Sequence, residues 1–447
     1  MLIHSILFYW VILMDNSQLI DKLKTIVYYC LGFVLFLLVI GVICINYVVI
    51  DGKKYDKSVE TLIITDSDFA RYNDYSFLKA FSRLKTVDVS SLDVSKDTVD
   101  HMMSDAGENV NILWNVKIGG NSYKSNTEHL TVPAETLGED SEAFSAFHHL
   151  KQFEIEGTAP IEELYKVIGV IRRNNPEVRC VYSSKIYGIP IDGTMDRICL
   201  DNKKIKNLDL VKYAVELFPN IKKFEMCDCG VSDEEMGNLR AQYPDREFKW
   251  MLHILIYDIP TDVQVFSTLV SNWVAYADHN TFAPIFKYCT DLRALDLGHW
   301  DNISDISEIR NLKNLEILII SDNSISDLTP LTELKHLKYM DLRYNKITDV
   351  SPLTELHELQ FLEVGGNKLS NAAQLCGCRS LKFLYIEDSV LPEKTIKELE
   401  KGVPEGCEFS MHHTRGHEWY KRIIGMFRRW KKVKVYHDWE NVEYYED

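Results

Sequence analysis

The feature that most constrains this chain is a 22-residue repeat in its C-terminal half. Three leucine-led segments cover residues 315–331, 337–353 and 359–375, and a shorter fourth covers 381–388. The period relates four leucines and three asparagines: Leu315, Leu337, Leu359 and Leu381, and Asn323, Asn345 and Asn367. A fixed period of this length predicts a solenoid, because one unit cannot bury its apolar side chains without its neighbours.

The residue types within a unit predict its local structure. Apolar residues at positions 1, 4 and 6 fill the interior of a coil, and the asparagine at position 9 satisfies backbone groups where the strand turns. The stretches from Ser326 to Leu331 and from Thr348 to Leu353 predict a capped turn that contains a proline. A unit of 22 residues has no room for a long helix on this side, so we expect a short helical turn.

The spacing L-x-x-L-x-L-x-x-N-x-L resembles bacterial leucine-rich repeats of the internalin-like class, tightly over residues 289–390. The resemblance implies an α/β fold, a curved, right-handed leucine-rich repeat solenoid. We expect its regular repeats to occupy residues 289–411.

The first half of the chain repeats on a longer period of 68 residues. Four isoleucines keep this spacing: Ile50, Ile118, Ile186 and Ile254. Gly52, Gly120 and Gly188 share the register, and Trp114, Tyr182 and Trp250 each precede an isoleucine by four. Apolar alternation followed by glycine predicts a strand that enters a hairpin or tight loop.

Each long unit also contains a strand like those of the regular repeats, at 84–89, 150–155 and 221–226. The last of these leads in register to Leu292, which favours one continuous solenoid with degenerate repeats over 47–288. Ser232 and Glu235 form a capping-box pattern at the start of a helix. The same order of helix and proline recurs at 161–176 and 392–404.

This organisation resembles membrane-anchored leucine-rich repeat proteins of gut Firmicutes. The resemblance rests on Gly52, Lys54 and Tyr55 and on the stretches 218–236 and 288–299. It implies a cell-surface protein with an unassigned binding partner, and it implies no reaction.

An uncharged apolar segment near the N-terminus predicts a membrane anchor. Residues 25–50 contain no charged side chain, and about 20 apolar residues suffice to cross a bilayer. We assign residues 1–24 to a short N-terminal segment and 25–46 to a transmembrane helix. No small-residue cleavage site follows it, which favours a retained anchor over a signal peptide. Met14 opens a more conventional start than Met1.

The orientation of this single-pass anchor rests on the resemblance. Basic residues near the membrane are balanced, with Lys22 and Lys24 on one side and Lys53, Lys54 and Lys57 on the other. The resemblance implies that the solenoid is extracytoplasmic, on the cell membrane. The opposite orientation would turn attention to cytoplasmic partners.

Composition argues against several classes of function. A net charge of −16 opposes nucleic acid as a partner. Cys289 and Cys378 fall in a column otherwise held by leucine, which predicts buried thiols, and the pair Cys227 and Cys229 is a weak metal signal. No nucleophile elbow, zinc-protease motif or paired-carboxylate motif is present. We therefore expect no enzyme, no cofactor and no metal.

Positions 3 and 5 of the regular repeats point off the concave sheet, because side chains alternate along a strand. Aromatic and charged residues there, with neighbours at positions 7 and 8 and with Trp300 at position 9 of its unit, form the predicted ligand-binding set: Trp300, Tyr339, Asp341, Arg343, Tyr344, Phe361, Glu363, Phe383 and Tyr385. An exposed aromatic stripe of this kind is typical of a recognition surface. The alternatives are rings that stack only for stability, or a register shifted by one residue that would bury them.

Residues 412–447 combine a basic helical pattern with an acidic end. Trp419, Ile423, Phe427 and Trp430 share one helical face, surrounded by lysines and arginines. We expect a C-terminal cap helix and a charged tail, because the family commonly ends in a comparable way. The alternative is a membrane-surface helix that binds anionic lipid or cell-wall polymer.

The combined prediction is a membrane-anchored protein that binds a protein or cell-surface ligand through its concave face. A second hypothesis is a sensor or receptor subunit that signals through a partner. Only about 24 residues precede the anchor, which disfavours an output domain of its own. The third hypothesis is an enzyme with a site in the degenerate half, for which a deep cleft with converging ionisable side chains would be required.

Overall fold

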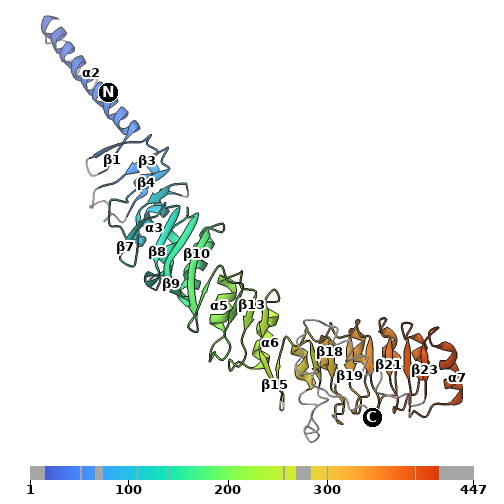
Figure 1. Cartoon of the computed structure of the whole chain (residues 1–447). Helices are drawn as coiled ribbons and strands as arrows, with labels where there is room; N and C mark the ends of the chain where they lie inside the picture. Colours follow the sequence, from blue (N-terminus) through green and yellow to red (C-terminus); the bar gives the residue numbers. More distant parts are fainter. Residues whose placement is uncertain are drawn as a thin grey trace. The chain divides into compact units, whose positions relative to one another are not determined.

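The computed structural model describes residues 16–50, 53–65, 74–107, 109–138, 140–254, 257–267, 283–299, 301–387 and 389–411. The chain divides into two compact units: unit 1 is residues 1–186 with 190–193, and unit 2 is residues 187–189 with 194–447. Figure 1 colours both along the sequence, and each is described by itself. The change of repeat type at 288–289 lies inside unit 2 and remains a boundary predicted from sequence.

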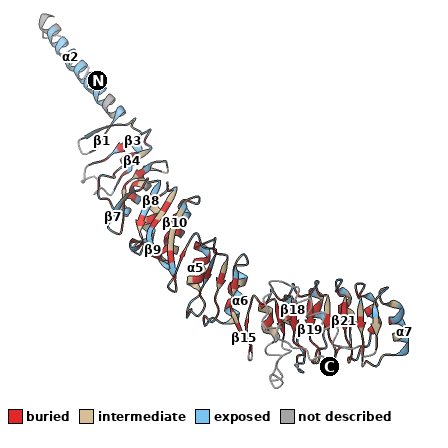
Figure 2. Cartoon of the chain, viewed as in Figure 1, coloured by how far each residue is buried: buried red, intermediate tan, exposed pale blue. Residues whose placement is uncertain are grey.

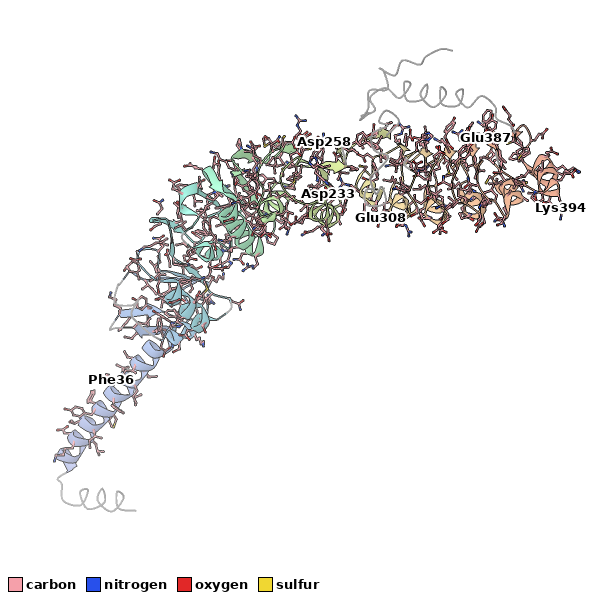
Figure 3. All side chains as sticks on the ribbon, turned by 90° about the horizontal axis from the view of Figure 1, so that it is seen from below. Phe36, Asp233, Asp258, Glu308, Glu387 and Lys394 are labelled. Atoms are coloured by element: carbon pink, nitrogen blue, oxygen red, sulfur yellow. The ribbon has the colours of Figure 1, made fainter. Side chains whose placement is uncertain are left out.

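Unit 1 begins with a long apolar helix, α2 (Asn16–Asn46). Its part from Asp21 to Gly41 is long and apolar enough to cross a membrane, and none of that window is buried within the protein. Large apolar side chains such as Phe36 point away from the helix with 59% of their surface exposed (Figure 3). The helix predicted at 25–46 is therefore confirmed as a helix, and it starts earlier than expected.

The 68-residue period appears in the structure as a recurring hairpin. The hairpin strands are β1 (Tyr47–Ile50) with β2 (Lys53–Asp56), β6 (Asn115–Ile118) with β7 (Asn121–Lys124), and β15 (Met251–Ile254) with β16 (Tyr257–Pro260). At the fourth place, the end of β10 (Arg179–Ile186) lies beside β11 (Ile189–Asp192). Gly120 and Gly188 turn these loops at φ values of +77° and +83°, which favour glycine. The predicted hairpins are confirmed.

Parallel strands follow the hairpins in groups of three. The first group is β3 (Thr61–Ile63), β4 (Thr86–Asp88) and β5 (Asn111–Leu113); the second is β8 (His129–Pro133), β9 (Gln152–Pro160) and β10; the third, in unit 2, is β12 (Arg197–Cys199), β13 (Lys223–Glu225) and β14 (Glu247–Lys249). The middle strand of each group is the repeat-like strand expected from sequence. The groups are separate sheets, so the parallel ladder is interrupted where continuity was expected.

Helices connect many of these parallel strands. They are α3 (Lys96–Ala106), α4 (Ile161–Asn174), α5 (Asp209–Leu217) and α6 (Asp233–Gln242). At α6 the Ser232 hydroxyl accepts from Glu235 N, and the Glu235 carboxylate accepts from Ser232 N at 3.1 Å, which confirms the capping box. Proline follows α4 and α6 within a few residues, as predicted from the sequence.

The rest of unit 2 is a parallel sheet of seven short strands. They are β17 (Val265–Ser267), β18 (Ala294–Asp296), β19 (Ile317–Ile319), β20 (Tyr339–Asp341), β21 (Phe361–Glu363), β22 (Phe383–Tyr385) and β23 (Glu408–Ser410). Short 3₁₀ turns on the other side include η8 (Thr329–Glu333) and η9 (Ser351–Glu355). The last connection is α7 (Glu393–Gly402). The leucines at position 1 and the leucine, isoleucine or valine at position 6 are buried, as the red interior in Figure 2 shows.

An asparagine ladder closes three of the regular coils, those that start at Leu315, Leu337 and Leu359. Asn345 donates its amide to the carbonyls of Ile320, Leu342 and Arg343 at 2.9–3.1 Å, and its oxygen accepts from Ile325 N at 3.0 Å. Asn323 and Asn367 make the same set of bonds one repeat earlier and one later. The role predicted for position 9 is thereby confirmed.

Buried cysteines take leucine or asparagine positions in unit 2. Cys289 and Cys378 are 0% and 2% exposed in the leucine column, as expected. Cys229 stands at the asparagine position of its repeat and donates its S–H to Leu200 O, with Sγ 3.0 Å from the oxygen. Burial raises the pKa of the Cys227 and Cys229 thiols to about 12 and about 11, so both are protonated at neutral pH.

Candidate binding face

The candidate site lies on the side of the seven-stranded sheet that faces away from the leucine core, here called the outer sheet face. Strand pairing fixes which side chains share a column. Tyr339 pairs with Phe361 and Phe361 with Phe383, which gives the position-3 column. Asp341, Glu363 and Tyr385 form the position-5 column in the same way. The register predicted from the sequence is confirmed.

The rings of the position-3 column contact one another. Tyr339 and Phe361 are stacked, with ring centroids 6.1 Å apart and planes 24° apart. Phe361 also lies 5.6 Å from the centroids of both Phe383 and Tyr385. Aromatic pairs at such distances stabilise the structure beyond the area that they bury. The column is therefore a continuous aromatic cluster across β20, β21 and β22.

The expectation that this set is exposed is wrong for three members. Phe361 is 3% exposed, Asp341 1% and Glu363 5%. Neighbouring parallel strands lie about 4.8 Å apart, so side chains in the middle of a column are covered by those on both sides. Tyr339, Arg343, Phe383 and Tyr385 are half-buried, and Tyr344 is exposed.

A charged cluster borders the aromatic column. Arg343 donates to both carboxylate oxygens of Asp341, through Nε at 3.0 Å and through Nη2 at 2.8 Å. Its Nε also lies 2.6 Å from Glu363 Oε2, yet that oxygen accepts no hydrogen bond. The single Nε hydrogen points at Asp341, so the contact with Glu363 is one of charge only. Glu387, labelled in Figure 3, lies 3.6 Å from Arg343 Nη1.

Burial and crowding shift the pKa values of this cluster. Burial raises the pKa of Glu363 to about 8, the neighbouring Asp341 charge adds to the rise, and Arg343 offsets part of it. Burial alone would lower the pKa of Arg343, but Asp341, Glu363 and Glu387 outweigh it and raise that pKa. With all acids ionised, one guanidinium among three carboxylates gives these four side chains a formal charge of −2, and protonation of Glu363 at neutral pH reduces it to −1. The cluster is thus an anionic site set beside aromatic rings.

Tyr344 is the exposed end of the site. It has a φ of +52°, and 41% of its surface is exposed. A Cβ added to Gly366 would lie 2.4 Å from the Tyr344 ring, so glycine in the next repeat leaves room for the ring. This placement was not evident from the repeat spacing, which identified the tyrosine but not its glycine neighbour.

Two other polar arrangements in unit 2 were missed by the sequence reasoning. Glu316 lies 2.6 Å from Arg293 Nη2 and 2.9 Å from Lys338 Nζ, beside a hollow of about 380 Å³. His253 lies between Asp258 and Asp228, at 2.7 and 3.0 Å, where those side chains raise its pKa against the effect of burial. The alternation of charge at position 2 of successive repeats could have predicted the Glu316 ion pairs. The pairing of His253 with Asp258 across a hairpin could have predicted the histidine site.

Some predicted residues lie outside the described part of the chain. They are Trp300 and the predicted cap and tail at 412–447, which includes the histidines 412, 413 and 417. Among the described residues, no group of three or more His, Cys, Asp and Glu side chains is placed to hold a metal ion.

Comparisons with known proteins identify the repeats. Residues 313–369 match the family model described as leucine rich repeat. A search of curated proteins gave no match. Residues 313–369 are therefore similar to leucine-rich repeats.

Several solved structures are similar at low identity. Internalin C2 from Listeria monocytogenes is 16% identical, covers 51% of this chain and 88% of its own, and has a TM-score of 0.28. Internalin F from the same organism is 14% identical, covers 67% and 87%, and has a TM-score of 0.26. A leucine-rich repeat protein from Leptospira interrogans is 14% identical, covers 78% and 99%, and has a TM-score of 0.27. At such TM-scores the fold assignment rests on the repeats described above.

Proposed function

We propose that this chain is a membrane-anchored binding protein whose outer sheet face, concave in the predicted solenoid, recognises a protein or a cell-surface ligand. The observation that carries the proposal is the aromatic cluster beside an anionic cluster on one side of a parallel sheet. Interface centres favour aromatic side chains and arginine, and both occur here. The proposal assigns no reaction to the chain.

Burial divides the predicted set into two roles. Tyr339, Phe383, Tyr385 and the exposed Tyr344 offer ring surface to a ligand, whereas Phe361 supports them from within the cluster. Asp341 is held by Arg343 and fixes the position of that guanidinium. The ligand-facing part of the site is therefore smaller than the nine residues predicted from sequence.

Anchoring is supported by the physical character of α2. Exposing the apolar side chains of this helix to water costs about 25 cal/mol of free energy for every Å² of apolar surface. A bilayer removes that cost, and the helix is long enough to span it. We place the repeats outside the cytoplasm on the resemblance set out above.

Site-specific photo-cross-linking tests the recognition face. A photoreactive residue is introduced at Tyr339, Tyr344 or Phe383 in cells that make the full chain, and at Thr332 and Glu355 on the opposite side as controls. The proposal predicts discrete products of higher mass from the first three positions only. Equal products from both sides, or none from the outer sheet face, would contradict it.

Thiol labelling tests the orientation. Cys199 is exposed on β12 and Cys30 on α2, Cys180, Cys376 and Cys407 are half-buried, and Cys227, Cys229, Cys289 and Cys378 are buried. A membrane-impermeant maleimide added to intact cells should label the native chain more strongly than Cys199→Ser. Labelling that requires lysis would place the repeats inside the cell.

A further inference from the structure

The proposed membrane helix leads into the first hairpin without a linker. Helix α2 ends at Asn46, and β1 begins at the next residue. Just after β2, Lys57 N donates to Asn46 O at 2.8 Å. The second hairpin has the same bond at the corresponding place of the repeat, from Ser125 N to Trp114 O at 2.9 Å. The first hairpin is therefore a member of the repeat series that is tied directly to the end of α2.

The apolar length of α2 places this hairpin at the surface of a bilayer. Residues 25–45 contain no charged side chain. As a helix they extend about 31 Å, and the hydrocarbon core of a bilayer is about 30 Å thick. A helix that crosses the core with this stretch brings β1 to the level of the lipid headgroups. Tyrosine is enriched at that level, and lysine is attracted to it.

One face of the hairpin exposes apolar and basic side chains together. Tyr47 and Val49 are 40% and 56% exposed, and Val49 is paired with Lys54 on β2. Alternate residues of a strand point to the same side, as do residues paired across two strands, so these three side chains share a face. Lys53 is exposed beside Lys54. At a membrane surface, the apolar side chains can enter the headgroup region while lysines extend their ammonium groups to phosphates.

The 68-residue period supplies an internal comparison for these residues. At the place of Val49, the later repeats carry polar side chains: Lys117, Lys185 and His253. At the places of Lys53 and Lys54, they carry no basic side chain: Asn121 and Ser122, Ile189 and Pro190, and Tyr257 and Asp258. Of the four repeats, the one that follows α2 is therefore the one that combines an exposed valine with a pair of lysines.

The local charge of the hairpin also differs from that of the chain. Residues 47–57 contain three lysines and two aspartates, a net charge of +1, whereas the whole chain carries −16. The carboxylate of Asp56, on the same face as Lys54, accepts from Ser58 N at 2.8 Å and from Ser58 Oγ at 2.7 Å. These bonds stabilise its charge within the protein. An anionic membrane is therefore not repelled here as it is by the rest of the chain.

We propose that the β1–β2 hairpin lies on the bilayer that α2 spans, with Tyr47 and Val49 in the headgroup region and Lys53 and Lys54 at the headgroups of anionic lipids. The inference rests on the proposed function, since it takes α2 to be a membrane anchor. The bilayer surface is then a second contact of the chain. It holds the start of the repeats against the membrane, which the helix alone would not do.

Photo-cross-linking to lipid tests the inference on the full chain. The chain is placed in nanodiscs of equal parts phosphatidylcholine and phosphatidylglycerol, with a photoreactive residue at Val49. The matched control has it at Lys117, which is the corresponding position of the second hairpin. Mass spectrometry should find lipid adducts from position 49 and none from position 117. Phosphatidylglycerol should exceed phosphatidylcholine in these adducts by at least about threefold, because each lysine near an anionic surface favours it.

Lysine variants test the source of the lipid preference. With the photoreactive residue at position 49, Lys53→Gln with Lys54→Gln should bring the ratio of the two lipids in the adducts close to one. Lys117→Gln with Lys124→Gln removes the same charge from the second hairpin and should leave the ratio unchanged. Three results would overturn the inference: no adduct from position 49, equal adducts from positions 49 and 117, or a lipid ratio that both double variants change equally or that neither changes.

A photoreactive residue at Phe36 separates this inference from the proposed anchoring. Phe36 lies within the apolar part of α2 and is 59% exposed. Lipid adducts from Phe36 without adducts from Val49 would leave the anchor standing and remove the inference. Adducts from neither position would remove both the anchor and the inference. Recognition by the outer sheet face is tested at other residues and is unaffected by either result.

Discussion

The long repeats and the regular repeats solve the same structural problem with different side chains. Both bury apolar residues behind short parallel strands, but they differ where each strand turns. In the regular repeats, a position-9 asparagine makes four hydrogen bonds to the backbone. The corresponding residues of the long repeats are Leu92, Thr158 and Cys229, and Cys229 satisfies one carbonyl with a thiol. The asparagine therefore fixes the turn with more hydrogen bonds than Cys229 does.

The long repeats also differ from the regular repeats in how far their parallel sheets extend. Their parallel strands stop after three, and a hairpin follows. The regular repeats instead extend one ladder over seven strands. The pairing of neighbouring strands aligns side chains into columns, and the aromatic cluster of the outer sheet face lies across three of the seven strands. We therefore propose the recognition surface on the regular part.

The largest expected effect distinguishes the buried ring that supports the aromatic cluster from the half-buried ring that is proposed to contact a ligand. Phe361→Ala should lower the unfolding free energy by about 3–5 kcal/mol, because it opens a cavity in a buried cluster. Tyr339→Ala, at the half-buried end of the same column, should cost about 1 kcal/mol or less. Denaturant unfolding followed by exchange of the β21 amides measures both. Equal costs would show that the column has no distinct exposed end.

A second comparison tests the turn chemistry directly. Asn345→Ala leaves buried backbone groups without partners and should cost about 3 kcal/mol. Cys229→Ala removes one weak hydrogen bond and little volume, so about 1 kcal/mol is expected. The same unfolding measurement applies to both variants. If the alanine at 229 cost as much as the one at 345, the proposed difference between the two repeat types would be wrong.

The pKa of Glu363 predicts a pH effect in the regular repeats. Its folded pKa is about 8 and its ordinary value is 4.5, so the folded state holds a proton that the unfolded state releases between those values. The stabilisation from the protonated form is complete below the lower value and is lost as pH rises through the higher one. Glu363→Gln should therefore gain stability over the native chain, on the order of 2 kcal/mol at pH 8.5 and little at pH 4. A gain that does not grow with pH would contradict this account.

The smallest effect concerns the hairpins of the long repeats. Gly188 adopts a φ of +83°, where a side chain is strained, and a Cβ there would meet no atom within 4 Å. Gly188→Ala should thus cost only the backbone strain, about 1 kcal/mol. Gly193→Ala, at a glycine without positive φ and with equal space, is the matched control and should cost less. Local unfolding of β10 followed by hydrogen exchange reports both.

Periodicity predicted most of the fold, because the repeat spacings record contacts between neighbours. The columns, the asparagine ladder, the hairpins at 68-residue spacing and the capping box at Ser232 were all evident from residue types. The interruption of the parallel ladder was not evident, because the residues of one strand do not show which strand will pair with it. Curvature and handedness remain predictions from the resemblance.

Burial at the candidate site was harder to predict than register. Alternation along β21 correctly placed Phe361 and Glu363 on the outer sheet face, but alternation cannot say how far neighbours cover a side chain. The role of Glu387 was missed because it follows β22 by two residues and reaches Arg343 from the next-but-one repeat. Such contacts depend on how coils stack, which no single repeat encodes.

The central claim is that the outer sheet face of the regular repeats is the recognition surface. Cross-linking from Tyr339 in intact cells, with products identified by mass spectrometry and compared with those from Thr332, tests it most directly. The account predicts products from Tyr339 that join one external partner, and none of these from Thr332. The same products from both positions, or no product from Tyr339, would contradict it.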